Sequence, residues 1–404
     1  MQTIRPSVAA RAPLGAMLLG VVLAGHHLFG RPAAAAHAAL SQAQAQMERN
    51  AQRREREVAA LPEPSLGHLK ALTDDIGIFE HASGTSPNKA HGYCAEDVAR
   101  ALVAVLMFDK EGGRQDGTAQ ALAETYMRYL RRSQRKDGGF HHRTDTRGRL
   151  SEETTTGDAY GRALWGLGYA VAHPASPAMG ARAREMFREA LPGSKALVWP
   201  RAIAYALLGL HHYLTRFPDD PSAKESMTRL ADALVGMFEA NSSADWRWFD
   251  DEMTYDNAKL PQALLLAYES TGNKAYLRTA ETTLDFLVSV NFPGRDMLQV
   301  IGNKGWYRRG GEPALYDQQP TDAASMVEAL AAAYRLTGRK EYRDLALKSF
   351  GWFLGGNIAG EPLYDPSTGG CRDGLGADGI NQNQGAESSI MALIALLTAR
   401  QLSR

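Results

Sequence analysis

The sequence has little cysteine and carries no excess of charge. Its 404 residues include only two cysteines, Cys94 and Cys371, whose spacing matches no metal-binding motif. Lysine and arginine together number 45, as do aspartate and glutamate, so the formal net charge is zero. A neutral chain lacks the positive field by which proteins attract nucleic acids and anionic membranes. We therefore expect no metal, no cofactor and no nucleic-acid partner.

The apolar run near the N-terminus, residues 13–25, is too short to span a membrane comfortably. It follows Arg5 and Arg11, and an alanine-rich stretch after it ends in Ala36-His37-Ala38. This order predicts a secretory signal peptide over residues 1–38, with an uncleaved membrane anchor as the alternative. We therefore expect a secreted or periplasmic protein that makes no membrane contact after cleavage.

The rest of the chain shows helical periodicity in segments that come in pairs. Short polar turns join the two segments of several pairs, for example at 216–220, 270–273 and 336–339, and longer segments separate the pairs. The spacing predicts helices at about 95–109, 117–134, 159–173, 177–191, 200–215, 221–240, 259–270, 274–290, 322–336, 339–354 and 386–402.

These pairs predict an all-α fold, an (α/α)6 toroid of helical hairpins with an inner and an outer ring. The last predicted helix has no partner, so a helix between about 40 and 72 is expected to close the ring. An open α-solenoid is the alternative. We assign residues 39–65 to an N-terminal helical lead-in and residues 66–404 to the barrel domain.

The first helix of each pair follows a long loop, so the loops are expected to gather at one end of the barrel, which we call the mouth. Residues 245–262 form the loop richest in aromatic and acidic groups. Sugars stack their C–H faces on aromatic rings and offer hydroxyls to carboxylates and amides. The sequence therefore predicts an aromatic-lined, acid-rich sugar pocket, with an ordinary surface loop as the alternative.

Glycosidic cleavage needs one protonated and one ionised carboxyl group. The candidates are Asp250 or Asp251 with one of Asp158, Asp322 or Glu387 across the ring. Asp158 and Asp322 have an alternative role as helix N-caps, and Glu387 as a first-turn acid favoured by the helix dipole. The expected substrate-binding residues precede or begin the inner helices: Tyr93, Asp97, His141, Arg162, Trp199, Arg201, Trp246, Trp248, Tyr255, Asp256, Lys259, Trp306, Asp317, Gln318, Gln382 and Asn383.

Several motifs resemble those of a little-characterised group in the six-hairpin glycosidase superfamily, whose members are often described as glycosidase-related or glycosyltransferase-associated. The motifs are TDDIGIFEHA (73–82), GYCAEDVARAL (92–102), DGGFHH (137–142), GDAYGRALWGLG (157–168) and DGLGADGINQNQGAES (373–388). The resemblance covers about residues 66–402 and implies an (α/α)6 barrel that acts on a carbohydrate. Asp97 and Arg100 match the group's GYC-x-D-D-N-A-R pattern, whereas Glu96 and Val98 stand where it has aspartate and asparagine.

The leading hypothesis is a glycoside hydrolase that cleaves an oligo- or polysaccharide, with inversion expected by analogy with this barrel class. A polysaccharide lyase is the first alternative, with Tyr255 and either His141 or His91 as the base. A non-catalytic carbohydrate-binding or polysaccharide-export protein is the second. A sugar epimerase of similar barrel shape is expected to place histidines at the ends of the inner helices. In this sequence acids and amides predominate at those positions, which disfavours an epimerase.

The two cysteines precede the first and last inner helices, which are neighbours in a closed ring. A disulfide between Cys94 and Cys371 is therefore one hypothesis for an oxidising compartment. The sequence gives no prediction of the oligomeric state.

Overall fold

The computed structural model describes residues 61–403 apart from 113–115, 153, 156 and 295. These described residues belong to one compact unit. The predicted signal peptide (1–38) and most of the predicted lead-in (39–65) lie outside them.

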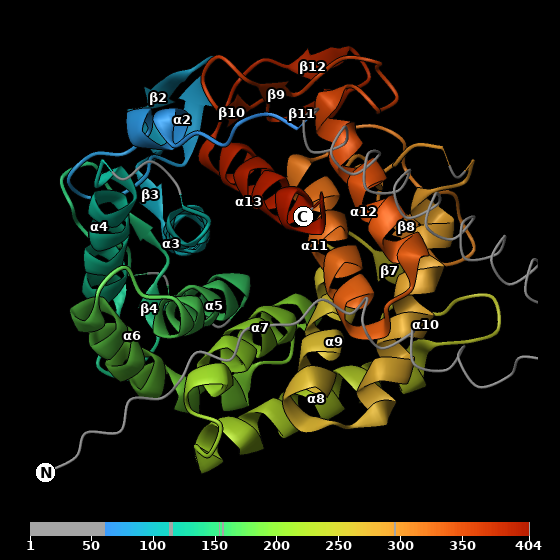
Figure 1. Cartoon of the computed structure of the whole chain (residues 1–404), viewed down its shortest axis with the longest axis horizontal. Helices are drawn as coiled ribbons and strands as arrows, with labels where there is room; N and C mark the ends of the chain where they lie inside the picture. The colour runs from blue at the N-terminus through green and yellow to red at the C-terminus, as the bar shows by residue number, and fades with distance from the viewer. Residues whose placement is uncertain (1–60, 113–115, 153, 156, 295, 404) are drawn as a thin grey trace, which may run out of the picture. The chain divides into compact units, whose positions relative to one another are not determined.

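The inner ring consists of helices whose sides are buried almost all round. Each packs against the next, and the last packs against the first, so the ring is closed (Figure 1). This confirms the (α/α)6 toroid and excludes the open solenoid. The inner helices are α3 (Ala95–Lys110), α5 (Asp158–Ala172), α7 (Pro200–Arg216), α9 (Lys259–Thr271), α11 (Pro320–Thr337) and α13 (Ala386–Ser403).

The outer helices are amphipathic and cover the ring from outside. They are α4 (Thr118–Ser133), α6 (Pro177–Ala190), α8 (Pro221–Asn241), α10 (Lys274–Asn291) and α12 (Lys340–Gly351). Among residues 61–403, the sixth outer position, beside α13, holds only the five-residue α2 (Gly67–Ala71). The predicted closing helix is therefore much shorter within the described residues than the sequence indicated. The described part of the chain also contains the 3-10 helices η2 (Lys89–His91), η3 (Leu191–Ala196) and η4 (Trp352–Leu354).

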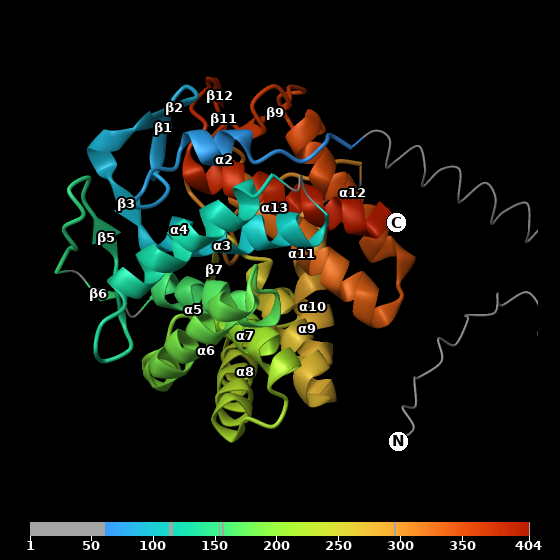
Figure 2. The ribbon, with the colours of Figure 1, turned by 60° about the vertical axis from the view of Figure 1, so that its left-hand side comes forward.

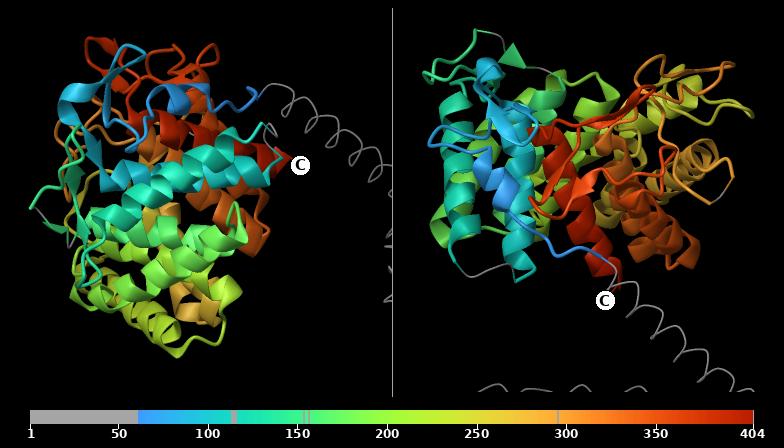
Figure 3. Two further views of the ribbon diagram at one scale, coloured as in Figure 1. Left: turned by 90° about the vertical axis from the view of Figure 1, so that its left-hand side faces the viewer. Right: turned by 90° about the horizontal axis from the view of Figure 1, so that it is seen from above.

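The loops contain short antiparallel strand pairs that the periodicity did not predict. The pairs are β1 (His81–Ser83) with β2 (Ser86–Asn88), β3 (Tyr93–Cys94) with β5 (Arg143–Thr144), β4 (Phe140–His141) with β6 (Thr154–Thr155), β7 (Glu252–Met253) with β8 (Tyr307–Arg308), β9 (Tyr364–Asp365) with β10 (Gly370–Cys371), and β11 (Gly374–Gly376) with β12 (Gly379–Asn381). Strands β1, β3, β5 and β6 lie at the side of the molecule opposite the C-terminal end of α13 (Figures 2 and 3). The loops therefore collect at the end where the inner helices begin.

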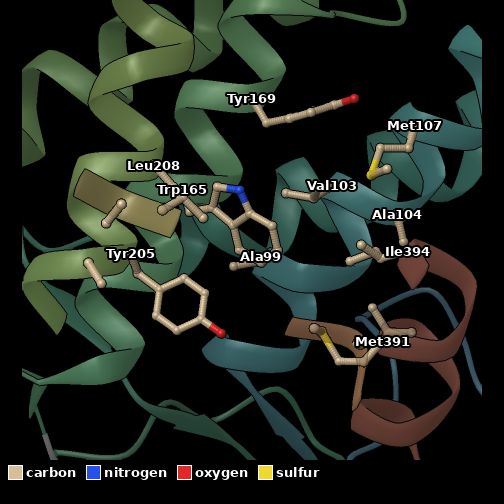
Figure 4. Close-up of a cluster of buried hydrophobic side chains, with 14 of the residues drawn as sticks. Ala99, Val103, Ala104, Met107, Trp165, Tyr169, Tyr205, Leu208, Met391 and Ile394 are labelled. Carbon is tan, nitrogen blue, oxygen red and sulfur yellow. The ribbon is translucent and has the colours of Figure 1, made fainter. Parts of the chain in front are cut away.

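The core between the inner helices depends on close backbone contact and on large aromatic side chains. A Cβ atom on Gly168 of α5 would lie 2.1 Å from the carbonyl oxygen of Gly209 on α7, so only glycine allows this approach. Nearby, the rings of Trp165 and Tyr205 lie 5.4 Å apart and face aliphatic side chains of α3 and α13 (Figure 4). This packing fixes how the helix starts are placed around the mouth.

Candidate functional site

A pocket of about 820 Å³ opens at the mouth, beside the seam where α13 meets α3. Its wall comes from the first turns of these two helices, from the β11–β12 hairpin, and from residues 80–81, 142–143, 303–304 and 317–319. The pocket therefore lies where the position of the long loops predicted it. Within the described part of the chain, its lining includes no tryptophan, tyrosine or phenylalanine, so the expected aromatic lining is wrong for this pocket.

Arg100 on α3 joins two carboxylates at the base of the pocket. Its Nη1 donates to Asp97 Oδ1 at 2.8 Å and forms an ion pair with Glu387 Oε2 at 2.6 Å. Because both oxygens contact one nitrogen, they lie no more than 5.4 Å apart. The Arg100 side chain is buried, whereas 37% of the Glu387 side chain is exposed to the pocket. One guanidinium thus holds two carboxyl groups from the first and last inner helices together.

The carboxyl group of Asp97 sits in a buried environment that favours its protonated form. Burial raises the pKa of Asp97 to about 7, and the nearby charge of Glu387 adds to this, while Arg100 opposes it. The second oxygen of Asp97 accepts a hydrogen bond of 3.1 Å from the Cys94 thiol. Asp97 is therefore able to hold and release a proton near neutral pH.

The neighbouring Glu96 has the opposite behaviour. Burial disfavours its charge, but Arg162, His142 and Arg100 together hold the pKa of Glu96 well below its ordinary value. His142 reaches this position because β5 pairs with β3, and the His142 carbonyl accepts from the Ala95 N–H at the start of α3 (2.8 Å). Its Nε2 lies 3.6 Å from Glu96 Oε1. A histidine therefore does stand at the start of an inner helix.

Polar contacts extend from the pocket to the starts of the remaining inner helices. Arg162 on α5 donates to Glu96 and lies 3.4 Å from Asp256, whose backbone N–H donates to Asp322 on α11 at 2.6 Å. Arg162 also lies 3.9 Å from Asp158. One continuous network thus links residues from all the inner helix starts.

Asp256 and Asp322 form the buried centre of this network. Burial raises the pKa of Asp322 well above its ordinary value, and the adjacent Asp256 raises it further. Asp256 adopts a left-handed backbone conformation (φ 57°) and accepts a hydrogen bond from Tyr205. Neither carboxylate lines the pocket, so the structure places both as supports beneath it.

The start of α7 joins the network through Arg201. This residue donates to Asp158 at 3.2 Å, and its guanidinium lies 4.0 Å from the centre of the Tyr255 ring. Tyr255 donates to Asp158 and lies 6.2 Å from the ring of Trp306. Asp158 and Asp322 lie inside α5 and α11, and the residues at the cap positions are Gly157 and Gln319. The alternative role of these acids as N-caps is therefore wrong.

Other predicted site residues lie away from the pocket. Asp250 and Asp251 are exposed, and Asp251 pairs with Arg309 at 3.4 Å outside the pocket lining. The indoles of Trp246 and Trp248 are no more than 2% exposed and belong to the core. The structure therefore does not bring the predicted Asp250 or Asp251 together with Glu387 at the pocket.

Of the remaining residues predicted to bind substrate, some line the pocket and others make contacts within the protein. Asp317 and Gln318 line the pocket, although Gln318 also accepts a hydrogen bond from Trp352. The others are held in local contacts: Lys259 pairs with buried Glu328, Tyr93 donates to Asp74, His141 contacts the Ser151 carbonyl, Gln382 accepts from Arg372, and Asn383 accepts from the Gly84 N–H. Trp199 is 63% exposed at the start of α7.

The pocket also contains residues that the sequence analysis did not select as site residues. Those with ionisable side chains include Glu80, His81, Glu96, Arg100, His142, Arg143 and Asp373. Most of them belong to the motifs quoted above, so the resemblance was the one signal available for them. Their convergence depends on ring closure and on the β3–β5 pairing, which helical periodicity does not reveal.

Both cysteines are free and buried, so the disulfide hypothesis is wrong for this structure. Among the described residues, no group of three or more histidine, cysteine or acidic side chains is arranged to hold a metal ion. The helices within that same part of the chain include none with the length and apolarity needed to cross a membrane.

Comparison of the coordinates with solved structures gives extensive matches at low sequence identity. The cellobiose 2-epimerase of Spirochaeta thermophila matches with a TM-score of 0.64 and 15% identity, over 87% of this chain and 96% of that chain. A D-mannose isomerase matches with a TM-score of 0.62 and 13% identity, over 87% and 97%. A GH76 α-mannanase of Bacteroides thetaiotaomicron matches with a TM-score of 0.55 and 13% identity, over 83% and 93%.

The chain has the six-hairpin glycosidase fold. No protein-family profile matches the sequence, and no curated protein matches it either. Proteins with the six-hairpin fold include both epimerases and glycosidases, so the fold alone does not select the reaction.

Proposed function

We propose that this protein is a carbohydrate-active enzyme, specifically a glycoside hydrolase in which Asp97 is the proton donor and Glu387 the ionised partner. The observation that carries the proposal is their joint contact with Arg100, which keeps the two oxygens within 5.4 Å. One carboxyl group has a pKa of about 7, and the other is exposed to the pocket. Glycosidases typically place their two carboxyl groups in different environments, so that one group stays protonated while the other is ionised.

The separation favours retention of the anomeric configuration over the inversion expected by analogy. Retaining enzymes hold their carboxyl groups roughly 5 Å apart, whereas inverting enzymes leave about 6.5–9.5 Å for a water molecule. In the proposed first step, Glu387 attacks the anomeric carbon while Asp97 protonates the departing glycosidic oxygen. Water then breaks the glycosyl–Glu387 bond, and Asp97 takes the proton from that water.

The first test is hydrolysis by the purified protein of nitrophenyl glycosides and of a panel of polysaccharides. Proton NMR of the first-formed sugar should show the anomer of the substrate. Glu387→Gln should lower kcat by about 10³-fold or more, since it removes the attacking carboxylate. Asp97→Asn should lower kcat/KM for substrates with poor leaving groups far more than for nitrophenyl glycosides, because kcat/KM reports the first step and only the poor leaving groups need a proton donor in that step.

Asp251→Asn is the matched control, because Asp251 is an exposed acid outside the pocket. We expect wild-type activity from it. An inactive Asp251→Asn enzyme that folds normally would instead support the catalytic role first predicted from the sequence. Inverted products would remove the Asp97–Glu387 pair from the mechanism.

A sugar epimerase or isomerase is the second candidate, and one observation favours it. His142 and His81 both line the pocket, and His142 lies beside Glu96. Histidine is able to remove a proton next to a sugar carbonyl. Incubation with mannose or cellobiose in D₂O would distinguish the candidates, since an epimerase incorporates deuterium at C2 and a hydrolase does not.

The lyase alternative has weaker support, because the environment of Tyr255, one of its predicted bases, does not favour proton abstraction. Burial raises the pKa of Tyr255, and its hydroxyl donates to Asp158, so its deprotonation is disfavoured. Absorbance from an unsaturated product on polygalacturonate would contradict our preference for a hydrolase.

We also propose export to the periplasm or the medium, on the basis of residues 1–38 alone. N-terminal sequencing of the protein from its native host would test this.

A further inference from the structure

Trp199 differs from every other tryptophan in the sequence. Its side chain is 63% exposed, and that of the preceding Val198 is 64% exposed. Trp165, Trp246, Trp248 and Trp352 are at most 2% exposed, and Trp306 packs partly against the core. An indole has a large apolar surface that folding normally removes from water.

The position of Trp199 in the helix adds a second cost. It is the N-cap residue of α7, and its side chain makes no cap hydrogen bond. Serine, threonine, aspartate or asparagine would stabilise this position, as Ser176, Asp220 and Asn273 do for α6, α8 and α10. Neither packing nor helix stability therefore accounts for a tryptophan here.

The surroundings of Trp199 connect it to the proposed active site. Two residues further on, Arg201 donates to Asp158, which lies 3.9 Å from Arg162, and Arg162 donates to Glu96 in the pocket wall. Trp199 thus stands at the mouth, two residues before Arg201, which belongs to a polar network that reaches the pocket wall. In ring order, α7 lies opposite α13, on which Glu387 stands.

We propose that Trp199 is a stacking platform for a pyranose ring of a sugar chain whose reacting linkage occupies the pocket. This inference rests on the proposed carbohydrate function and deepens it, since it specifies a substrate of several sugar units that crosses the mouth. The flat apolar indole fits the C–H face of a pyranose, and the partly exposed Arg201, Asp158 and Glu96 offer partners to sugar hydroxyls. Trp199 does not line the pocket, so a monosaccharide held by the pocket residues alone is not expected to stack on it.

The test compares Trp199→Ala and Trp199→Phe with the wild type, and Leu354→Ala serves as the control for loss of an exposed apolar side chain. Electrophoresis in gels that contain yeast mannan, carboxymethylcellulose or polygalacturonate measures binding to chains. Assays with nitrophenyl monoglycosides measure the pocket alone. Trp199→Ala should weaken retardation by at least one polymer about tenfold, Trp199→Phe by less than about threefold, and all variants should treat monoglycosides like the wild type.

Because gel retardation does not require hydrolysis, it tests the platform even if the protein hydrolyses nothing. If the protein hydrolyses none of the substrates but its retardation by a polymer still depends on Trp199, the hydrolase proposal fails and the platform remains supported. Unchanged polymer binding by Trp199→Ala would overturn the inference, as would an equal loss on polymers and monoglycosides. A wild-type dimer that becomes monomeric in Trp199→Ala, seen by sedimentation velocity, would also overturn it by assigning the indole to contact between two copies.

Discussion

Arg100 and Glu387 lie at opposite ends of the barrel sequence, yet their side chains meet at 2.6 Å and join α3 to α13. The same guanidinium binds Asp97, and only 1% of the Arg100 side chain is exposed. This contact therefore belongs both to the closure of the ring and to the chemistry of the pocket.

Replacing Arg100 by leucine should reduce the free energy of unfolding by about 1–3 kcal/mol, because it leaves the buried carboxyl group of Asp97 without its hydrogen-bond donor. Chemical denaturation followed by circular dichroism would measure the change. Arg309→Ala is the control, since the Arg309–Asp251 pair is exposed and should contribute at most about 1 kcal/mol. Equal effects of the two substitutions would contradict the structural role given to Arg100.

The pH dependence of hydrolysis should follow the ionisation of Asp97. Burial raises the pKa of Asp97 to about 7, and only the protonated form is able to donate to a leaving group. We expect kcat/KM for a substrate with a poor leaving group to fall as pH rises through about 7. The Asp97→Asn enzyme should lose this limb, whereas Asp317→Asn should keep it.

The same ionisation has a consequence for stability that does not depend on activity. The folded protein keeps the Asp97 proton up to about pH 7, whereas an unfolded aspartate releases it near pH 4. The contribution of Asp97 to the free energy of unfolding therefore decreases between about pH 4 and pH 7. Over this window Asp97→Asn should show a weaker decline than the wild type. An identical slope in both proteins would refute the raised pKa.

The end of the barrel opposite the mouth should be sensitive to acid. His173 caps α5 at its C-terminus, and burial lowers its pKa to about 4, with Lys110 and Arg216 adding to the effect. The unfolded state binds a proton at this residue near pH 6.5 and the folded state only near pH 4, so stability falls as pH decreases between these values. Burial also lowers the pKa of the adjacent His212, in the same direction.

His173→Gln should flatten this acid dependence, as measured by thermal melts from pH 7 to pH 4. Replacing the exposed pocket residue His81 by glutamine is the control and should leave the dependence unchanged. A melting temperature that falls equally steeply in the wild type and His173→Gln would show that other groups cause the acid sensitivity.

Gly168→Ala should destabilise the protein by about 1–3 kcal/mol, because the added Cβ would push α5 away from the Gly209 carbonyl. Gly236→Ala is the matched control. Gly236 lies inside α8 with no atom within 4 Å of an added Cβ, so alanine there should be neutral or stabilising by up to about 1 kcal/mol. Denaturant midpoints of the two variants would show the difference, and similar midpoints would contradict the close approach of α5 and α7.

The helices were predictable because their apolar residues recur at helical spacing, one-sided in the outer helices and nearly continuous in the inner ones, and because turn or proline signals end several of them. The predicted segment at 221–240, for example, corresponds to α8 (Pro221–Asn241). Ring closure was predictable from the repetition of hairpins, although the short α2 was not. The sequence also located the mouth, since loop length alone distinguishes the two ends of such a barrel.

Positions within the mouth were harder to predict, because sequence shows which residues precede a helix but not which way they point. In the loop before α9, Trp246 and Trp248 turn into the core, Asp250 and Asp251 turn to solvent, and Asp256 reaches the network. His142 reaches the pocket through strand pairing with β3, although its nearest following helix along the chain is α5. The composition of the loops therefore predicted that a site lies at this end of the barrel, but it did not identify which residues line the pocket.

The position of the Arg100 clamp has a consequence for biosynthesis. The proposed proton donor arrives with the first inner helix, but the carboxylate opposite it arrives with α13, the last inner helix to be synthesised. A ribosome-bound chain that lacks this helix therefore has neither a sealed barrel nor a complete pair of catalytic groups. The proposed activity therefore requires that α13 has been synthesised and has packed against α3.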